Sequence, residues 1–224
     1  MKIKYIILIL VYSTCLSVHA KKIPGYIIDK EGNKMETVFQ IQYNYLTGKF
    51  NYPKLQKSVL YYTVDNYKKR LFPEDCKGIG LDLNDSIIEF IALKNKYLTK
   101  GIYPDYLFLR PKIVGPVTVY YYYFNHSYAV GSQDGSMSTS SIMMNGWILE
   151  NELGPYFAIK YGNGSREEYS QLFFDCPELV EKIENKEIKV SQMELMVRVY
   201  NKWKKIQDMP VNNTLKDSAD IKKE

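Results

Sequence analysis

The sequence predicts an α+β fold in which an antiparallel, β-rich body is followed by three short C-terminal helices packed on it. As far as Gly164, short runs of β-branched and aromatic residues are separated by Gly, Pro, Asn and Asp, which is typical of strands and turns. After Gly164, apolar residues recur at intervals of three and four, the period of an amphipathic helix. We therefore expect a β-rich body over residues 21–164 and a helical segment over residues 165–208 of the same domain.

Residues 1–20 have the parts of a secretory signal peptide. Lys2 and Lys4 precede an apolar run at residues 5–12, and residues 18–20 form a small-x-small cleavage site. The apolar run is far shorter than the ~20 residues that a membrane-spanning helix needs. We expect cleavage after Ala20 and export, with a periplasmic or outer-membrane-associated location. An uncleaved N-terminal anchor and a lipoprotein attached through Cys15 are the alternatives.

The charges of the chain argue against a nucleic-acid partner. The 30 Lys and Arg and 25 Asp and Glu give a net charge of +5, to which Lys2 and Lys4 of the signal contribute. The other lysines mostly stand singly between apolar residues rather than in a basic patch. After the signal, we expect no membrane-spanning segment, and the aperiodic residues 209–224 should be disordered.

The N-terminal part of the body predicts a β-hairpin. Ile23–Ile28 and Thr37–Tyr43 are strand-like, and residues 29–33 between them carry turn residues. The chain should turn again at residues 46–52. Further strands are expected in residues 57–65, at the end of 71–83, in 84–95, in 103–124 and in 142–162.

Prolines and small polar residues should interrupt the later strands. Pro104, Pro111 and Pro116 are expected to divide residues 103–124 into short pieces, because proline cannot donate to a central ladder. The small polar run at residues 131–141 predicts a loop.

Three helices are expected after Gly164. Ser165 and Glu168 have the spacing of a capping box at the start of a helix over residues 166–174. Asp175 should cap the second helix, and Ser191 with Glu194 should begin the third. One apolar stripe on this last helix is predicted to face inward, formed by Leu195, Met196, Val199, Tyr200, Trp203 and Ile206.

Two cysteines remain after signal cleavage, Cys76 and Cys176. In an oxidising compartment they could form a disulfide, and as free thiols they would behave as small buried hydrophobic residues.

The order of several short motifs resembles that of an uncharacterised secreted family common in Bacteroidetes. The motifs in this chain are GYIIDKEGN, FPEDCKGIG, GPVTVYYYYF, DCPELVEKI and MVRVYNKW. Members of the family carry G-Y-I-x-x-x-x-G-D, P-x-D-I-x-G-F, G-x-x-S-L-Y-Y-Y and a closing helix that ends in Y-N. The resemblance covers roughly residues 24–203. It implies an exported protein with this architecture, and it implies no reaction, because the family has no established activity.

Two departures from the family pattern concern the cysteines. Cys76 occupies an apolar position of the family motif, and Trp203 stands where many relatives have a cysteine after the closing Y-N. The resemblance therefore implies that Cys76 and Cys176 are free and at least partly buried.

Residues for catalysis or metal binding are few. His126 is the only histidine outside residues 1–20, and its position at a strand end favours a turn or surface role over that of a base. A site built from several imidazoles is excluded, and no cysteine pair has zinc spacing. Gly162 and Gly164 lack the lysine and spacing of a phosphate loop and predict a turn. We expect no catalytic, metal-binding or cofactor-binding residues, and no cofactor.

Carboxylates supply the one enzymatic alternative. A glycosidase needs two of them facing each other across a cleft, which sequence spacing cannot show. The candidates for a hydrolase acting on envelope polysaccharide or peptide are Glu74, Asp75, Glu150 and Glu152.

The tyrosine-rich strand at residues 117–124 is apolar on both faces. Tyr121 and Tyr123 point to one face, and Tyr120, Tyr122 and Phe124 point to the other. We expect the strand to be central or near-central and covered by the helix over residues 192–207, because a solvated face would alternate with charged or small polar residues. The alternative is an open aromatic platform for a glycan or peptide, formed by Tyr120, Tyr122, Phe124, His126 and Tyr128.

These observations predict an exported cell-envelope protein that acts by non-enzymatic binding or scaffolding. The expected partner is an envelope protein or a glycan, and the carboxylate-dependent hydrolase is the alternative.

Overall fold

The computed structural model describes residues 19–44, 49–83, 86–98, 103–131, 137–159 and 162–208. It confirms the α+β, β-rich fold. The chain forms two compact units. Of the described residues, the sheet unit holds 19–112, 119–149 and 157–159, and the helical unit holds 113–118, 150–156 and 162–208. The boundary thus crosses the ends of strands rather than lying at Gly164.

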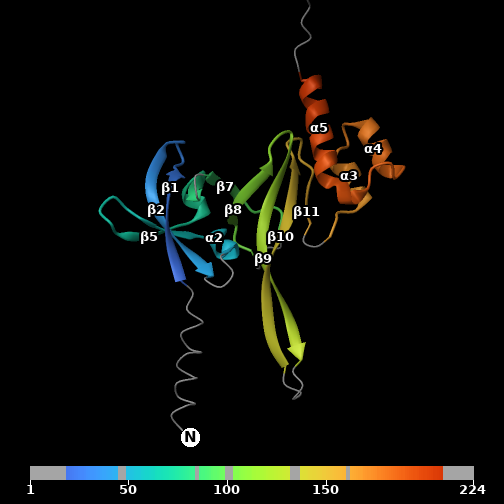
Figure 1. Cartoon of the computed structure of the whole chain (residues 1–224). Coiled ribbons are helices and arrows are strands. Elements are labelled where there is room, and N and C mark those ends of the chain that lie inside the picture. Colours follow the sequence, from blue (N-terminus) through green and yellow to red (C-terminus); the bar gives the residue numbers. More distant parts are fainter. Residues whose placement is uncertain are drawn as a thin grey trace, which may run out of the picture. The chain divides into compact units, whose positions relative to one another are not determined.

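The strands form one antiparallel sheet (Figure 1). Its order is β11-β10-β9-β8-β7-β6-β1-β2-β4-β5, and β3 pairs with β2 beside this path. The strands are β1 His19–Ile28, β2 Lys34–Asn44, β3 Lys49–Phe50, β4 Val59–Tyr62, β5 Lys68–Leu71, β6 Gly78–Leu83, β7 Ser86–Lys94, β8 Tyr106–Ile113, β9 Val117–Gly131, β10 Met137–Asn151 and β11 Tyr156–Ile159.

The predicted first hairpin is confirmed, and its turn is closed by one carboxylate. Asp29 Oδ1 accepts hydrogen bonds of 2.7 Å from the backbone N–H groups of Gly32 and Asn33. Gly32 has φ +103°, a backbone conformation that residues with a Cβ rarely adopt. The hydrogen bonds from Asn33 and the turn backbone lower the pKa of Asp29. Local turn chemistry therefore fixes the register of β1 on β2.

The glycines of β6 allow a tyrosine ring of β1 to lie across the sheet. Tyr26 pairs with Gly80, and a Cβ at Gly80 would lie 2.3 Å from Cζ of the Tyr26 ring. The Tyr26 hydroxyl donates to Glu89 on β7, and Lys34 Nζ lies 4.2 Å from the ring centroid. The GYI and GIG motifs of the sequence therefore have a packing role in the structure.

A short helix, α2 Tyr52–Leu55, lies between β3 and β4 in the chain. Leu55 enters a core built mainly on β1, β2, β6 and β7. Gln56 directly after it is buried, and its carbonyl accepts a 2.9 Å hydrogen bond from the N–H of Phe108 on β8. Its side-chain oxygen accepts a hydrogen bond from the N–H of Tyr123 on β9. Gln56 thus ties α2 to the tyrosine-rich part of the sheet.

Two sequence expectations for the later strands are wrong. Residues 137–141 belong to β10 rather than to a loop, since serine and threonine are tolerated on a ribbon that is exposed here on both faces. β8 continues through Pro111 to Ile113 without a break. The strand expected in residues 84–95 is confirmed as β7.

The helical unit contains α3 Arg166–Leu172, α4 Pro177–Glu184 and α5 Met193–Gln207. The predicted capping box is confirmed, because Glu168 N–H donates to Ser165 Oγ and Ser165 N–H donates to Glu168. The predicted caps of the other two helices are wrong. Cys176, not Asp175, is the N-cap residue of α4, and α5 begins after a 3₁₀ turn at Val190–Gln192 without a side-chain cap from Ser191.

The inward face of α5 is rotated from the predicted stripe. The buried residues are Met193, Met196, Val197 and Tyr200, whereas Leu195, Val199 and Ile206 are exposed. Several spacings of three and four were available, and the sequence did not distinguish the correct one.

The signal peptide and the tail fall largely outside the described residues. Residues 1–18 and 209–224 are not described, so the predicted signal and disordered tail stay predictions. Cleavage after Ala20 would leave β1 starting at Lys21.

Candidate binding surface

The surface predicted on the tyrosine-rich strand is mostly buried. Tyr120, Tyr122 and Phe124 have exposed fractions of 8%, 1% and 4%, so the platform prediction is wrong for these three residues. His126 is half-buried, and Tyr128 is 41% exposed and lies 6.3 Å from it, ring centroid to ring centroid.

The sheet unit itself buries these rings. Tyr122 and Phe124 stack at 5.5 Å within a cluster that includes Leu107, Leu109 and Ile148. A Cβ at Gly146 would lie 2.3 Å from the Tyr122 ring, so the glycine leaves the space that the ring fills. Burial of this face therefore does not require the C-terminal helix, and its predicted cover by that helix stays a prediction.

The opposite face of β9 carries a row of four half-buried rings. Tyr52 of α2 stacks on Tyr123 with ring centroids 4.4 Å apart. Tyr123 and Tyr121 lie 6.2 Å apart and nearly parallel along β9. Tyr121 in turn lies 4.4 Å from Trp147 on β10.

Two cations from β8 accompany these rings. The Arg110 guanidinium lies 5.6 Å from the Tyr121 centroid, and its charge opposes the rise that burial causes in the pKa of Tyr123. Lys112 Nζ lies 4.3 Å from the centroid of Trp147 and 5.3 Å from that of Tyr121. Cations in these positions are attracted to the ring quadrupoles. We call the six residues the aromatic strip: Tyr52, Arg110, Lys112, Tyr121, Tyr123 and Trp147.

Alternation along the strands places the members of the strip together. Tyr121 and Tyr123 are two residues apart, as are Arg110 and Lys112 on neighbouring β8, so each pair shares a face. Burial raises the pKa of Tyr52 and of Tyr123, while Arg110 opposes both shifts. The strip is thus partly desolvated, and it contains two positively charged side chains.

Sequence reasoning identified the tyrosine run but selected the wrong face. The signal that could have found the strip was the presence of Arg110 and Lys112 at alternating positions in the preceding strand. A face that combines large rings with cations is rarely a closed core, because a charge there must be paired or solvated.

The sheet unit also contains a pocket of about 670 Å³ on another part of its surface. Its charged residues are Lys54, Lys57, Arg70, Glu74 and Asp105, all of them exposed. An exposed carboxyl is not desolvated, and desolvation is what most often prepares a general acid. The pocket therefore contains one predicted carboxylate, Glu74, without the environment that catalysis needs.

The other predicted carboxylates have structural or exposed positions. Asp75 accepts a 3.3 Å hydrogen bond from the N–H of Phe72 and so closes the turn at Pro73–Asp75. Glu152 lies in the turn after β10 ends at Asn151, so it does not share a strand face with Glu150 as expected.

The two cysteines are free and buried, as predicted. Burial raises the pKa of Cys76 to about 11 and also raises that of Cys176. Neither thiol therefore has the low pKa of a nucleophile. Within the described part of the chain, no three His, Cys, Asp or Glu side chains are arranged to hold a metal ion.

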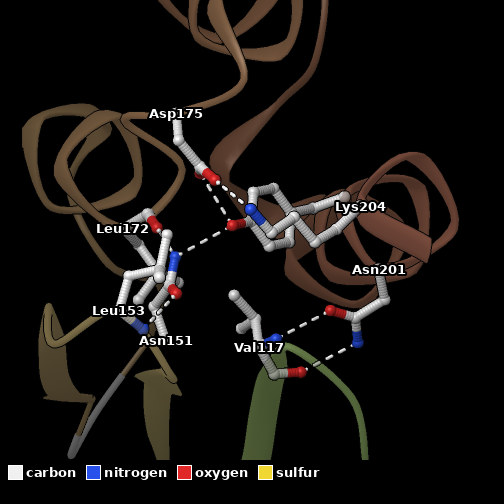
Figure 2. Close-up of polar contacts among 8 residues, drawn as sticks. Val117, Asn151, Leu153, Leu172, Asp175, Asn201 and Lys204 are labelled. Carbon is white, nitrogen blue, oxygen red and sulfur yellow. Dashed lines mark hydrogen bonds and ion pairs between the residues drawn. The ribbon is translucent and has the colours of Figure 1, made fainter. Parts of the chain in front are cut away.

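The closing Tyr200–Asn201 pair has a structural role in the helical unit, and Figure 2 shows Asn201 beside Val117. The Tyr200 hydroxyl donates to Asp175 at 2.7 Å and accepts from Asn151 at 3.2 Å. Asn201 pairs with both backbone groups of Val117, each at 2.8 Å, much as a neighbouring strand would. Lys204 completes the network by an ion pair of 3.2 Å with Asp175. The closing motif therefore attaches α5 to strand ends of its own unit.

Comparison with protein-family models, with curated proteins and with solved structures gives no significant match. Among the helices of the described residues, none has the length and hydropathy of a membrane-spanning segment.

Proposed function

We propose that this chain is an exported cell-envelope protein that binds a polysaccharide through the aromatic strip, without catalysing a reaction on it. The observation that carries the proposal is the continuous row formed by Tyr52, Tyr123, Tyr121 and Trp147, whose members are half-buried and held by one another. Rings fixed in this way lose little conformational entropy when a ligand binds. The expected signal peptide supports the envelope location.

The chemistry of the strip favours a glycan over a protein. Each ring carries a polar atom, either a tyrosine hydroxyl or the indole N–H, beside its apolar surface. A sugar unit likewise combines C–H and hydroxyl groups, so ring and sugar can match in both respects. A protein interface core is depleted of lysine, whereas the strip contains Lys112. A polymer of repeating units also suits a row of repeated rings.

The hydrolase alternative gains no support from the predicted carboxylates. Among the described residues, the pocket with Glu74 and Asp105 leaves both carboxyls exposed, and Asp75 is engaged in a turn. Binding without catalysis is therefore the function that the geometry supports best.

The test is binding of purified protein to a panel of soluble polysaccharides by affinity electrophoresis. Trp147→Ala and Tyr121→Ala should each weaken binding about tenfold, because each removes one of the four rings of the strip. Tyr62→Ala is the matched control. Tyr62 is also half-buried and lies under two lysines, Lys22 and Lys68, but it is outside the strip.

Circular dichroism should show that all three variants fold. Loss of binding in Tyr62→Ala but not in the strip variants would overturn the proposal. Absence of binding to every polysaccharide, together with capture of a purified envelope protein that requires Trp147, would instead assign the strip to a protein partner.

A further inference from the structure

Arg110 lies among the rings of the aromatic strip and contributes a positive charge there. It lies over Tyr121, and its charge opposes the rise in the pKa of Tyr123 and of Tyr52. Among the residues that the structure describes, no Asp or Glu forms an ion pair with it. A half-buried guanidinium has lost part of its hydration and gains more from an anion than an exposed cation does.

The rings hold Arg110 ready for such a partner. Its contacts with Tyr121 and Tyr123 limit its rotamers, so less entropy is lost when a bidentate pair forms. A planar carboxylate matches the guanidinium fork, and the hydroxyls of neighbouring tyrosines can donate to the same anion. Lys112 adds a second positive charge on the same face of β8.

We propose that the ligand of the aromatic strip is an acidic polysaccharide, with a carboxylate of the polymer paired to Arg110. This inference rests on the proposed function and adds the chemical class of the sugar. It is carried by the charge complementarity between the strip, which holds two cations, and a polyanion.

The pocket near α2 is the competing site for an acidic polymer, since Arg70, Lys54 and Lys57 line it. There, however, Glu74 and Asp105 supply negative charge in the same lining, and the cations are exposed. A surface of mixed sign attracts a polyanion less than a strip whose described charges are both positive.

The experiment compares each acidic polysaccharide with its own carboxyl-reduced form. Galacturonan, alginate and hyaluronan are titrated into the full-length mature protein, each beside the reduced polymer with the same backbone. Three variants that each lose one positive charge are compared: Arg110→Gln in the strip, Arg70→Gln in the pocket and Arg198→Gln at an exposed position of α5. Arg110→Lys tests whether charge alone suffices.

We expect at least one acidic polymer to bind about tenfold more tightly than its reduced form. Arg110→Gln should abolish that difference, so that this variant binds the acidic polymer no more tightly than it binds the reduced one, whereas Arg70→Gln and Arg198→Gln should preserve the difference. Arg110→Lys should retain only part of it, because an ammonium lacks the bidentate geometry.

Equal binding of the acidic and reduced forms would overturn this inference and leave the proposed function intact. The inference would also be overturned if Arg110→Gln still bound the acidic polymer more tightly than the reduced form, or if Arg70→Gln lost that difference. If no polymer in either form binds, the proposed function fails with it.

Discussion

The two faces of β9 use the same residue type for opposite purposes. Tyr122 on one face is almost completely buried and lies across Gly146 on β10. Tyr121, its neighbour in the chain, is half-buried and lies between Trp147 and the cations of β8. A strand alternates its faces, so a run of identical residues can satisfy two different environments.

The residues of the adjacent strand distinguish packing tyrosines from surface tyrosines. A glycine in the adjacent strand provides space for a ring, as Gly146 does for Tyr122 and Gly80 does for Tyr26. A lysine or arginine at an alternating position in the adjacent strand indicates a face that stays in contact with water. The neighbouring strands, rather than the tyrosine run itself, decide which face is which.

The largest effect should come from deleting one ring on each face. Tyr122→Ala should lower the free energy of unfolding by about 3–5 kcal/mol, because it leaves a cavity in a closed core. Tyr121→Ala should cost only about 1–2 kcal/mol, the loss of ring contacts at a half-exposed site. Urea unfolding monitored by circular dichroism measures both values. Equal destabilisation by the two substitutions would contradict the assignment of the faces.

Glycine substitutions should produce the next largest effect. At Gly146, an added Cβ would lie 2.3 Å from the Tyr122 ring and 2.5 Å from the carbonyl oxygen of Ile159. Backbone cannot yield as a side chain can, so Gly146→Ala should cost about 1–3 kcal/mol. Gly131, near the end of the same hairpin, has no atom within 4 Å of its Cβ position and is the matched control.

Gly131→Ala should leave the urea midpoint almost unchanged. If Gly146→Ala leaves the free energy of unfolding unchanged, the ring of Tyr122 can move away. The contrast between the two faces of β9 would then be weaker than the packing indicates.

The fold was largely predictable because it depends on local signals. Asp29 and Gly32 specify the first turn, and Ser165 with Glu168 specifies the start of α3. The inward stripe of α5 was not predictable, because two stripes of similar hydrophobicity differ only in what the rest of the unit offers them. Asp175 shows the same limit. Aspartate is a common N-cap residue, but here it accepts hydrogen bonds from the Tyr200 hydroxyl and from Lys204 Nζ, which come from elsewhere in the chain.

The candidate site was predictable only in part for a related reason. Tyr121 and Tyr123 belong to a tyrosine run that is evident in the sequence. Tyr52, in contrast, joins the strip from a short helix distant in sequence, next to Gln56, which contacts Tyr123. No local pattern reports a contact between residue 52 and residue 123. The strip therefore became visible only once strand order and register were known.

The smallest expected effect concerns pH and tests how far the open face is desolvated. Burial raises the pKa of Tyr123 above its ordinary value of 10.0. The folded state therefore holds the phenolic proton more firmly than the unfolded chain does. The stability that this provides is fully present below about pH 10 and is lost as the pH rises through the folded pKa.

Tyr123→Phe removes the ionisable group, so its unfolding free energy should fall less steeply between about pH 9 and pH 11 than that of the wild type. Tyr52→Phe should act in the same direction, because burial raises the pKa of Tyr52 as well. Urea titrations at a series of pH values measure these slopes. A slope for Tyr123→Phe identical to that of the wild type would show that water reaches this face as freely as bulk solvent, and the rings of the strip would then be separate surface residues rather than a partly desolvated row.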